Sequence, residues 1–595
     1  MKPYKLFYII SLITLSACES DLNLLPKDSL TSDVYFKTEK DFQLYANGLY
    51  QQLPDFGENS NDNMTDLYYA GGPNSVSNST YIESQNDGTW NTCYSNIRNC
   101  LVLLEEEAKL EEGDLKNSVQ VYKGEAHFFL AMNYYNLLRY FGGVPLIDHT
   151  LTLTDPDLYK PRASREDIVN FIIDNLDKAI NAPVGTLTSS DQEGRITITA
   201  VRAFKARVAL FEGTWRKFHE LGGEQEMFDI AIEESSKVLE DPNYYLFDER
   251  EILGDMSYFY MFILESDEKS NPAGIKKESN HAYILTRKHN KLDSPTGYIA
   301  VTNGNLSPTL KLMDMFLDTK GLPITHPETN FKGHGFQIDP VTKEAINIEF
   351  QNRDPRMSCN LIEPFTQFWY HSPYHRNYDW TDEELVNTGA WNDGFWTSGT
   401  GYLLGKYIPE IEGAVGIDYP VIRLEEVMLI YAEALFERDG SISDEDLNKS
   451  INKLRDRVGM PHLTNNFCSQ YGLDMRTEIR RERTIELMAE GFRYDDIRRW
   501  AVGETEMNQD MKGILWTNSP ISTPGGFEVY NEKEDKIVKT DFSNRVYTVD
   551  ENGFIILEPA SSRKFSSKHY LRPLPLRQIA LSNGTLEQNP GWVSQ

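Results

Sequence analysis

Two long stretches of the chain carry apolar residues at the spacing of amphipathic helices. In the first, from about 38 to 241, the clearest case is Leu115–Tyr140, where apolar residues recur every three or four positions and predict one buried face. Gly142 and Gly143 follow it and predict its end. Ser164 and Asp167 have the spacing of a capping box and predict a helix start. Further helices are expected over 41–53, 90–110, 164–180, 199–215 and 227–239.

The second helical stretch runs from about 420 to 502. Apolar faces over 421–435 and 447–458 predict a pair of helices, with Gly440 between them, and 475–500 predicts one further helix. Short helices in succession, joined by short turns, are typical of helical-hairpin repeats of the tetratricopeptide kind, although the strict repeat signature is absent.

The segments between and after the helices have a different composition. Residues 242–417 and 503–595 are rich in Gly, Pro, Asn, Ser and aromatic residues, and their periodicity is weak. Asn552-Gly553 is a strong turn dipeptide and predicts a hairpin between 546–549 and 554–557. The aromatic content favours packed loops over disorder.

The N-terminus has the features of a bacterial lipoprotein signal. Lys2 and Lys5 precede the apolar run Leu6–Leu15, which is too short for a membrane span of roughly 20 residues. Leu15-Ser16-Ala17-Cys18 then has the form of a lipobox. We expect a signal peptide over 1–17, a lipid on Cys18, and a polar tether over 18–37 that joins the lipid to the folded body.

Charge and cysteine content exclude several classes of partner. The 595-residue chain has a net charge of −31, which argues against binding to nucleic acid or to anionic membrane through a basic face. Apart from Cys18, four cysteines remain, without zinc-site spacing. Cys93 and Cys100 would lie about 10 Å apart along one helix, too far for a disulfide, so we expect buried thiols. No cofactor is indicated.

Catalytic motifs are missing from the sequence. It has no GxSxG, HExxH or Walker A motif. His371 and His375 are four residues apart, but Pro373 between them disfavours a shared helical face, so we expect no metal there. The chain has 90 acidic residues, so a carboxylate pair for glycosidic hydrolysis remains an alternative, but no pair stands out. We therefore expect a binding protein and no enzyme.

Aromatic residues in polar loops are the best candidates for ligand contact. Flat rings cover the apolar faces of sugars, while Asn, Asp, Arg or Gln bind their hydroxyl groups. Each ring could instead pack a loop onto the helices. The candidate glycan-binding residues are Tyr81, Tyr283, Tyr298, Asn303, Trp369, Tyr370, Trp380, Trp391 and Trp396.

An ordered set of motifs along the chain resembles the SusD/RagB family of Bacteroidetes outer-membrane lipoproteins. No single motif is decisive, but their order from residue 18 to 595 is highly specific. Most of these motif residues lie on predicted helices or turns, and we therefore interpret them as structural. The motifs are Gly124-Glu125-Ala126, Phe141–Leu146, Gly194–Thr197, Asn352–Arg356, Tyr419–Leu424, Arg481–Trp500, Tyr570–Pro575 and Gln588–Trp592.

The resemblance implies a mainly α fold, with a tetratricopeptide-like scaffold and a large loop-rich, aromatic-rich subdomain. It also implies an outer-membrane protein on the cell exterior, anchored in lipid through Cys18, that delivers an oligosaccharide to a SusC-like TonB-dependent β-barrel transporter. A peptide-capturing member of the family, a surface glycoside hydrolase and a structural repeat adaptor are the alternatives. The expected divisions are helical repeats over 38–241, a ligand-binding insertion over 242–417 and a C-terminal region over 418–595.

Overall fold

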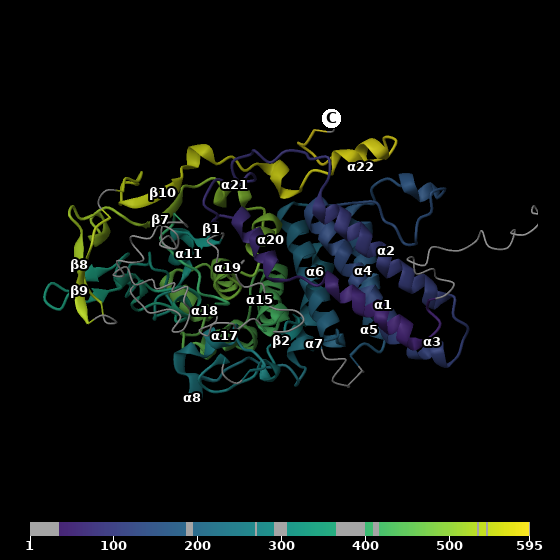
Figure 1. Ribbon diagram of the computed structural model, residues 1–595, viewed down its shortest axis with the longest axis horizontal. Coiled ribbons are helices and arrows are strands. Elements are labelled where there is room, and N and C mark those ends of the chain that lie inside the picture. The colour runs from purple at the N-terminus through teal and green to yellow at the C-terminus, as the bar shows by residue number, and fades with distance from the viewer. Residues whose placement is uncertain are drawn as a thin grey trace, which may run out of the picture.

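The computed structural model shows an elongated, mainly helical molecule with helices at one end and short strands at the other (Figure 1). Among the described residues, no helix is both long enough and apolar enough to cross a membrane. The structure describes residues 35–185, 194–267, 270–290, 306–364, 399–408, 416–531, 535–542 and 545–593.

The N-terminal helices form a side-by-side array in which helices α2, α4, α5, α6 and α7 contact one another in that order. Their positions confirm the helices expected from the apolar pattern to within a few residues, except that the one expected over 115–140 is interrupted at Val119 and forms two helices, α3 and α4. The array comprises α1 (Glu39–Leu49), α2 (Gly88–Ala108), α3 (Asp114–Ser118), α4 (Gln120–Phe141), α5 (Arg165–Asn181), α6 (Ile198–Phe218) and α7 (Glu224–Leu239).

Helix α4 lies at the centre of this array and is buried on nearly all sides. The apolar spacing predicted only one buried face and therefore underestimated how much of the helix is buried. Its close fit against α5 depends on Gly124, because a Cβ there would lie 2.5 Å from Ala182 Cβ. The predicted end is confirmed, since Gly142 follows Phe141 with φ +76°. The capping box at the start of α5 is also confirmed: the Asp167 amide donates to Ser164 Oγ at 3.0 Å.

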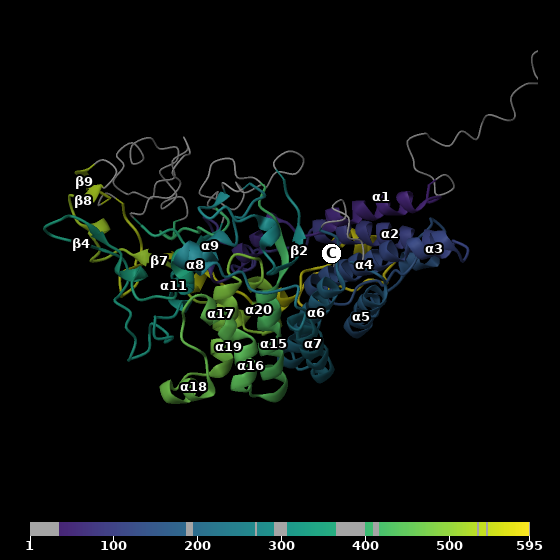
Figure 2. The ribbon, with the colours of Figure 1, turned by 90° about the horizontal axis from the view of Figure 1, so that it is seen from below.

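The second helical stretch extends the same array. Seen from below in Figure 2, α15 lies beside α6 and α7, and α19 packs on α15, so the array continues across the intervening loop-rich segment. The helices of this part are α15 (Leu424–Asp439), α16 (Asp444–Lys449), α17 (Ile451–Arg457), α18 (Asn465–Tyr471), α19 (Met475–Glu486), α20 (Arg493–Arg499), α21 (Gly503–Glu506) and, near the C-terminus, α22 (Leu576–Leu581).

Three expected helices are corrected by the structure. The helix expected to begin near residue 421 begins only at Leu424, as α15, because residues 419–423 form a strand. The helix expected over 447–458 breaks at Ser450, whose hydroxyl donates to the Asp446 carbonyl that a continuous helix would use. The first change depends on pairing of this strand with Tyr283–Arg287 and the second on a local hydrogen bond, and apolar spacing reports neither.

The single helix expected over 475–500 is wrong, because α19 and α20 are separated by a turn at 487–492. In this turn the Ala489 amide donates to the Tyr68 hydroxyl (2.8 Å), and the Gly491 amide donates to Asp62 Oδ2 (2.9 Å). Acceptors from a segment more than 400 residues away therefore take amide hydrogens that a continuous helix would use. Ala489 has a φ of +57°, outside the helical region.

The loop-rich parts contain short helices and two-stranded antiparallel sheets. The hairpin expected around Asn552-Gly553 is only partly formed: Val549 makes a single bridge to Ile555, and strand β10 pairs mainly with β7. The paired strands are β1 (Tyr68–Tyr69) with β3 (Ser307–Pro308), β2 (Tyr283–Arg287) with β6 (Tyr419–Arg423), β4 (Gln337–Ile338) with β5 (Ala345–Ile346), β7 (Met511–Leu515) with β10 (Phe554–Glu558), and β8 (Phe527–Asn531) with β9 (Lys536–Thr540). The short helices are α8 (Arg250–Leu253), α9 (Ser257–Tyr260), α11 (Leu310–Met315) and α12 (Arg356–Asn360).

A buried ionic network joins the loop-rich segment to the C-terminal helices. Glu486 accepts hydrogen bonds from Arg423 (2.8 Å), Arg356 (3.0 Å) and Arg457 (2.7 Å), and its pKa lies well below the ordinary value because these guanidinium groups outweigh the cost of burial. The structural interpretation of these motif residues is supported, but their pairs link different elements and are not confined to one helix. Other members are Asp354, Lys406, Glu425, Arg455, Glu482 and Glu490.

The cysteines expected to be buried thiols are confirmed as such. Cys93 and Cys100 lie on α2 with free, buried side chains, and Cys359 and Cys468 are likewise free and buried. They stabilise the core as small apolar groups.

Candidate functional site

Of the residues expected to contact a ligand, the structure describes two, Tyr81 and Tyr283. Placement of the remaining candidates stays a prediction. Outside the described residues lie the lipid-anchor candidate Cys18 and the ligand candidates Tyr298, Asn303, Trp369, Tyr370, Trp380, Trp391 and Trp396.

Tyr81 packs against the C-terminal segment. Its ring lies edge-on to Trp592, with the ring centres 5.9 Å apart, and its amide donates to the Ser75 carbonyl at 2.9 Å. Burial raises the pKa of its hydroxyl. These contacts hold the 75–81 loop against the last described residues, and they do not bring Tyr81 to Tyr283, which lies in β2 against β6.

Tyr283 lines a polar cavity of about 190 Å³ between β2, the turn after α7 and the start of β6. Its hydroxyl donates to the Met261 carbonyl at 3.1 Å, and burial holds its pKa well above the ordinary value, so the hydroxyl is neutral. The ring is thus one wall of the cavity. The lining residues are Tyr244, Met261, Leu264, Lys277, Glu278, Asn280, His281, Tyr283, Thr286, Lys288, Ile417 and Asp418. We call this the Tyr283 cavity.

A buried ion pair forms the floor of the Tyr283 cavity. Lys277 Nζ donates to Asp418 Oδ1 at 2.7 Å, and Asp418 Oδ1 also accepts from the His289 amide at 2.8 Å. The other carboxylate oxygen of Asp418 lies 3.2 Å from Lys288 Nζ. The side chain of Asp418 is only 5% exposed, so these partners fix its position and compensate its buried charge.

An aromatic pair lies at the rim of the Tyr283 cavity. The ring of Tyr245 stacks on His281, with ring centres 4.6 Å apart and planes inclined by 21°, while His281 Nδ1 lies 3.1 Å from the Asn243 carbonyl oxygen. Tyr245 is 55% exposed. A large, exposed, oriented ring beside a polar cavity is suited to stacking on the apolar face of a sugar, with the cavity groups available to its hydroxyls.

The sequence interpretation missed Tyr245 and His281. The signal was present, because Pro242-Asn243-Tyr244-Tyr245 is a polar loop with adjacent aromatics, the same pattern that selected the other candidates. The proximity of Tyr245 to His281 is decided by the fold.

The described part of the chain encloses two smaller cavities. One, of about 80 Å³, lies between α4, α6, β6 and α20, and its four arginines face four carboxylates, as in a hydrated ionic interior. The other is smaller, at about 30 Å³, and is mostly apolar, although Asn347 Oδ1 and Ser519 Oγ have no hydrogen-bond partner there. Neither cavity combines room with an exposed ring.

Comparison with known proteins decides the family. The family model described as the SusD family matches residues 270–592, more than half of the chain. A second model, described as starch-binding associating with outer membrane, matches residues 28–210. The chain belongs to the SusD family.

Individual SusD-like relatives agree with this assignment. SusD-like protein P2 of Formosa agariphila is 24% identical over 536 residues, covering 84% of this chain and 92% of the relative. SusD-like protein P38 of the same organism is 26% identical over 215 residues, which is 34% of this chain and 41% of P38. The match therefore spans less than half of P38.

Solved SusD-like structures share the fold. A SusD-like protein from Bacteroides fragilis NCTC 9343 superposes with a TM-score of 0.67 at 23% identity, covering 96% of this chain and 100% of that structure. A SusD-like carbohydrate binding protein from the same strain gives 0.66 at 19% identity, covering 91% and 98%. A laminarin binding SusD-like protein gives 0.55 at 18% identity, covering 94% and 100%. The mainly α, tetratricopeptide-like architecture is thus the SusD fold.

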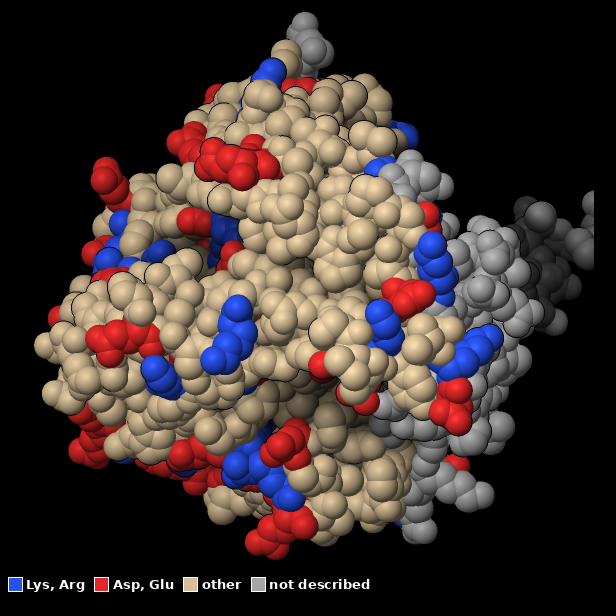
Figure 3. All heavy atoms as spheres, turned by 90° about the vertical axis from the view of Figure 1, so that its left-hand side faces the viewer, with Lys and Arg blue, Asp and Glu red and all other residues tan. Residues whose placement is uncertain are grey.

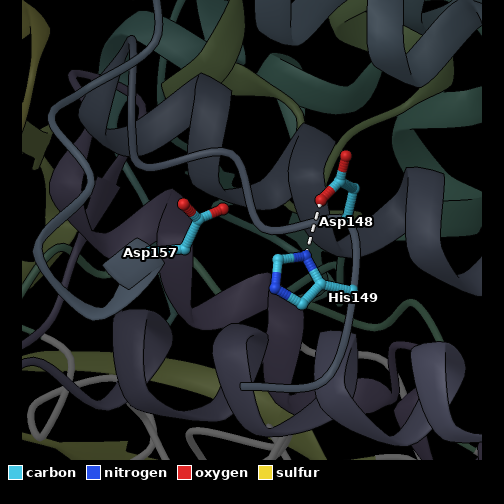
Figure 4. A group of neighbouring side chains, drawn as sticks. All are labelled: Asp148, His149 and Asp157. Carbon is cyan, nitrogen blue, oxygen red and sulfur yellow. Dashed lines mark hydrogen bonds and ion pairs between the residues drawn. The ribbon is translucent and has the colours of Figure 1, made fainter. Parts of the chain in front are cut away.

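One acidic group in this SusD-family protein has the composition of a cation site. Asp148, His149 and Asp157 offer ligand atoms within 4.8 Å of one another, and Figure 4 shows the His149 ring facing Asp148. His149 is hydrogen-bonded on both ring nitrogens, to Asp148 (2.9 Å) and Asp155 (3.0 Å), and Asp157 pairs with Lys160 (2.9 Å). These bonds satisfy the group internally, so we assign no metal to it.

Proposed function

We propose that this protein is a cell-surface lipoprotein that binds an oligosaccharide at the Tyr283 cavity and delivers it to a TonB-dependent β-barrel transporter. The observation that carries the binding site is the exposed Tyr245 ring, which stacks on His281, a residue that lines the polar cavity. Sugar recognition requires this combination of a flat apolar surface and neighbouring hydrogen-bonding groups.

Family relationships support the carbohydrate ligand. The matching models are described as SusD and as starch-binding, and two proteins of the same fold are described as carbohydrate binding and laminarin binding. The outer-membrane location rests on the description of the second family model and on the lipobox at Cys18. The transporter partner rests on the SusD resemblance.

We also propose that the protein binds its ligand without cleaving it. The sequence carries none of the hydrolase motifs sought, and the Tyr283 cavity holds Asp418 in an ion pair with Lys277, which removes a general acid or base from its floor. Incubation of the purified protein with each glycan that it binds tests this. Release of reducing ends would contradict the proposal.

The binding site is tested with the soluble form that lacks residues 1–18. Tyr245→Ala should weaken the affinity for a bound glycan by about 1–3 kcal/mol, the cost of one lost stacking contact by analogy with stacked bases. The melting temperature should change little, because the ring is mostly exposed. Affinity gel electrophoresis and calorimetry with laminarin and other polysaccharides provide the measurement.

Tyr159→Ala is the matched control, because Tyr159 is similarly exposed, at 47%, but is separate from the cavity, whereas Tyr245 stacks on the lining residue His281. Equal affinities for the wild type and both variants would remove the Tyr283 cavity from the site. The affinity would then be measured on the aromatic candidates outside the described residues.

A further inference from the structure

Both lysines of the Tyr283 cavity are paired with its buried carboxylate, Asp418. Two lysines, Lys277 and Lys288, and two carboxylates, Glu278 and Asp418, line it, so their formal charges cancel when His281 is neutral. We propose that the cavity is selective for neutral sugars and rejects sugars that carry carboxylate or sulfate groups. This inference rests on the proposed glycan-binding function and specifies its ligand class.

Lys277 has no hydrogen available for an acidic sugar. An ammonium group has three donors. Nζ of Lys277 donates to Asp418 Oδ1 at 2.7 Å and to the carbonyl oxygens of His289 (2.6 Å) and Gly416 (2.8 Å). A ligand anion could bind this lysine only by displacing one of these partners, which would leave a buried acceptor unsatisfied.

The second lysine is held by the same carboxylate. Lys288 Nζ lies 3.2 Å from Asp418 Oδ2, and Asp418 is almost fully buried. The Lys288 side chain is 40% exposed, so an anion can reach it, but its positive charge already compensates the buried Asp418 and attracts a ligand anion less than an unpaired lysine would. The other carboxylate, Glu278, is at the exposed rim, where it accepts from Ser266, and it would repel an approaching anion.

The field of the whole molecule acts in the same direction. The chain carries a net charge of −31, which slows the approach of a polyanion and weakens its binding, above all at low salt. On the face shown in Figure 3, the described basic side chains lie singly or in small groups among acidic ones, without a continuous basic patch. Neutral sugars avoid these costs, and the Thr286 hydroxyl together with the acceptor lone pairs of the Tyr244 and Tyr283 hydroxyls matches their hydrogen-bonding chemistry.

The test compares polysaccharides of matched backbone and different charge, using the soluble form that lacks residues 1–18. Dextran is compared with dextran sulfate and with carboxymethyl dextran, which share its backbone, and laminarin is added as a second neutral polysaccharide, each measured at low and at physiological salt. We expect binding to at least one neutral polysaccharide and a measurably weaker affinity for its anionic derivatives. Stronger binding to an anionic member would overturn the inference while leaving glycan binding intact. Binding to neither class would refute the proposed function itself.

Charge variants separate the cavity from the overall field. Glu278→Gln should strengthen the residual affinity for an anionic polysaccharide by about threefold at low salt, because it removes a negative charge at the rim. Glu166→Gln is the matched control, since Glu166 is an exposed carboxylate outside the cavity and the net charge changes equally. Equal gains in the two variants would overturn the assignment to the cavity.

Asp418→Asn provides a second, stronger change. It removes the negative charge that Lys277 and Lys288 share and should raise the affinity for an anionic polysaccharide by about tenfold, although Lys277 keeps its bonds to the His289 and Gly416 carbonyls. Circular dichroism and the melting temperature establish that the variant is folded. A folded Asp418→Asn protein that still rejects anionic sugars as strongly as the wild type would contradict the inference, and the Glu278→Gln result stands if the variant does not fold.

Discussion

Replacement of Arg423 by methionine should strongly destabilise the fold. The Arg423 side chain is 1% exposed, and it lies where β6 meets α15. Its Nη1 donates to Glu486 Oε1 at 2.8 Å, its Nε donates to Glu490 Oε2 at 2.9 Å, and Nη2 donates to the Glu486 carbonyl at 2.6 Å. Methionine retains much of the apolar stem but removes all of these donors.

The magnitude follows from what the substitution leaves behind. Glu486 and Glu490 remain buried with less positive charge around them, since only Arg356, Arg457 and Lys406 still contact them. Removing one partner of a buried ion pair typically costs about 3–5 kcal/mol, because the remaining charge loses its compensation. We expect a decrease of this size in the free energy of unfolding at pH 7.

Arg438→Met is the control, because Arg438 pairs with Asp229 and Asp439 but its side chain is 28% exposed. A pair exposed to this degree contributes at most about 1 kcal/mol. Denaturant titration followed by circular dichroism gives both free energies, and equal m-values are required for the comparison, since a large chain can unfold in more than one step. A loss for Arg423→Met no larger than that for Arg438→Met would refute the network as a source of stability.

Three further predictions concern the anchor, a buried acid and the tryptophan-rich segment. Cys18→Ala should leave the protein folded but release it from the membrane pellet, and its persistence there without a transporter would contradict lipidation. Asp62→Asn should stabilise the protein at pH 8 by on the order of 1–4 kcal/mol, because burial raises the pKa of Asp62 to about 7. The wild type is destabilised as Asp62 ionises, so its free energy of unfolding falls as the pH rises toward 7. An equal advantage of Asp62→Asn in denaturant titrations at pH 5 and pH 8 would contradict this prediction. Alanine at Trp369, Trp391 or Trp396 should weaken glycan binding by about 1–3 kcal/mol with little change in melting temperature, and the reverse result would indicate packing.

Much of the helical scaffold was determined by the sequence itself. Apolar spacing located α2, α4, α5, α6 and α7, because a helix with a buried face must repeat its apolar residues every three or four positions. The Ser164–Asp167 box and the glycines after Phe141 marked helix ends, since these act through neighbouring backbone groups. The order of the motifs along residues 18–595 was sufficient to indicate the SusD family, which the family model confirms.

Tertiary structure decided where contacts cross long sequence distances. The break between α19 and α20 depends on Tyr68 and Asp62, whose acceptors take amide hydrogens from the turn at 487–492, and no local pattern contains that information. The Tyr283 cavity likewise requires three separate segments, because Tyr245 meets His281 and Lys277 meets Asp418 only after folding. Local periodicity reports which face of an element is buried, whereas the partner that buries it is chosen by packing of the whole chain.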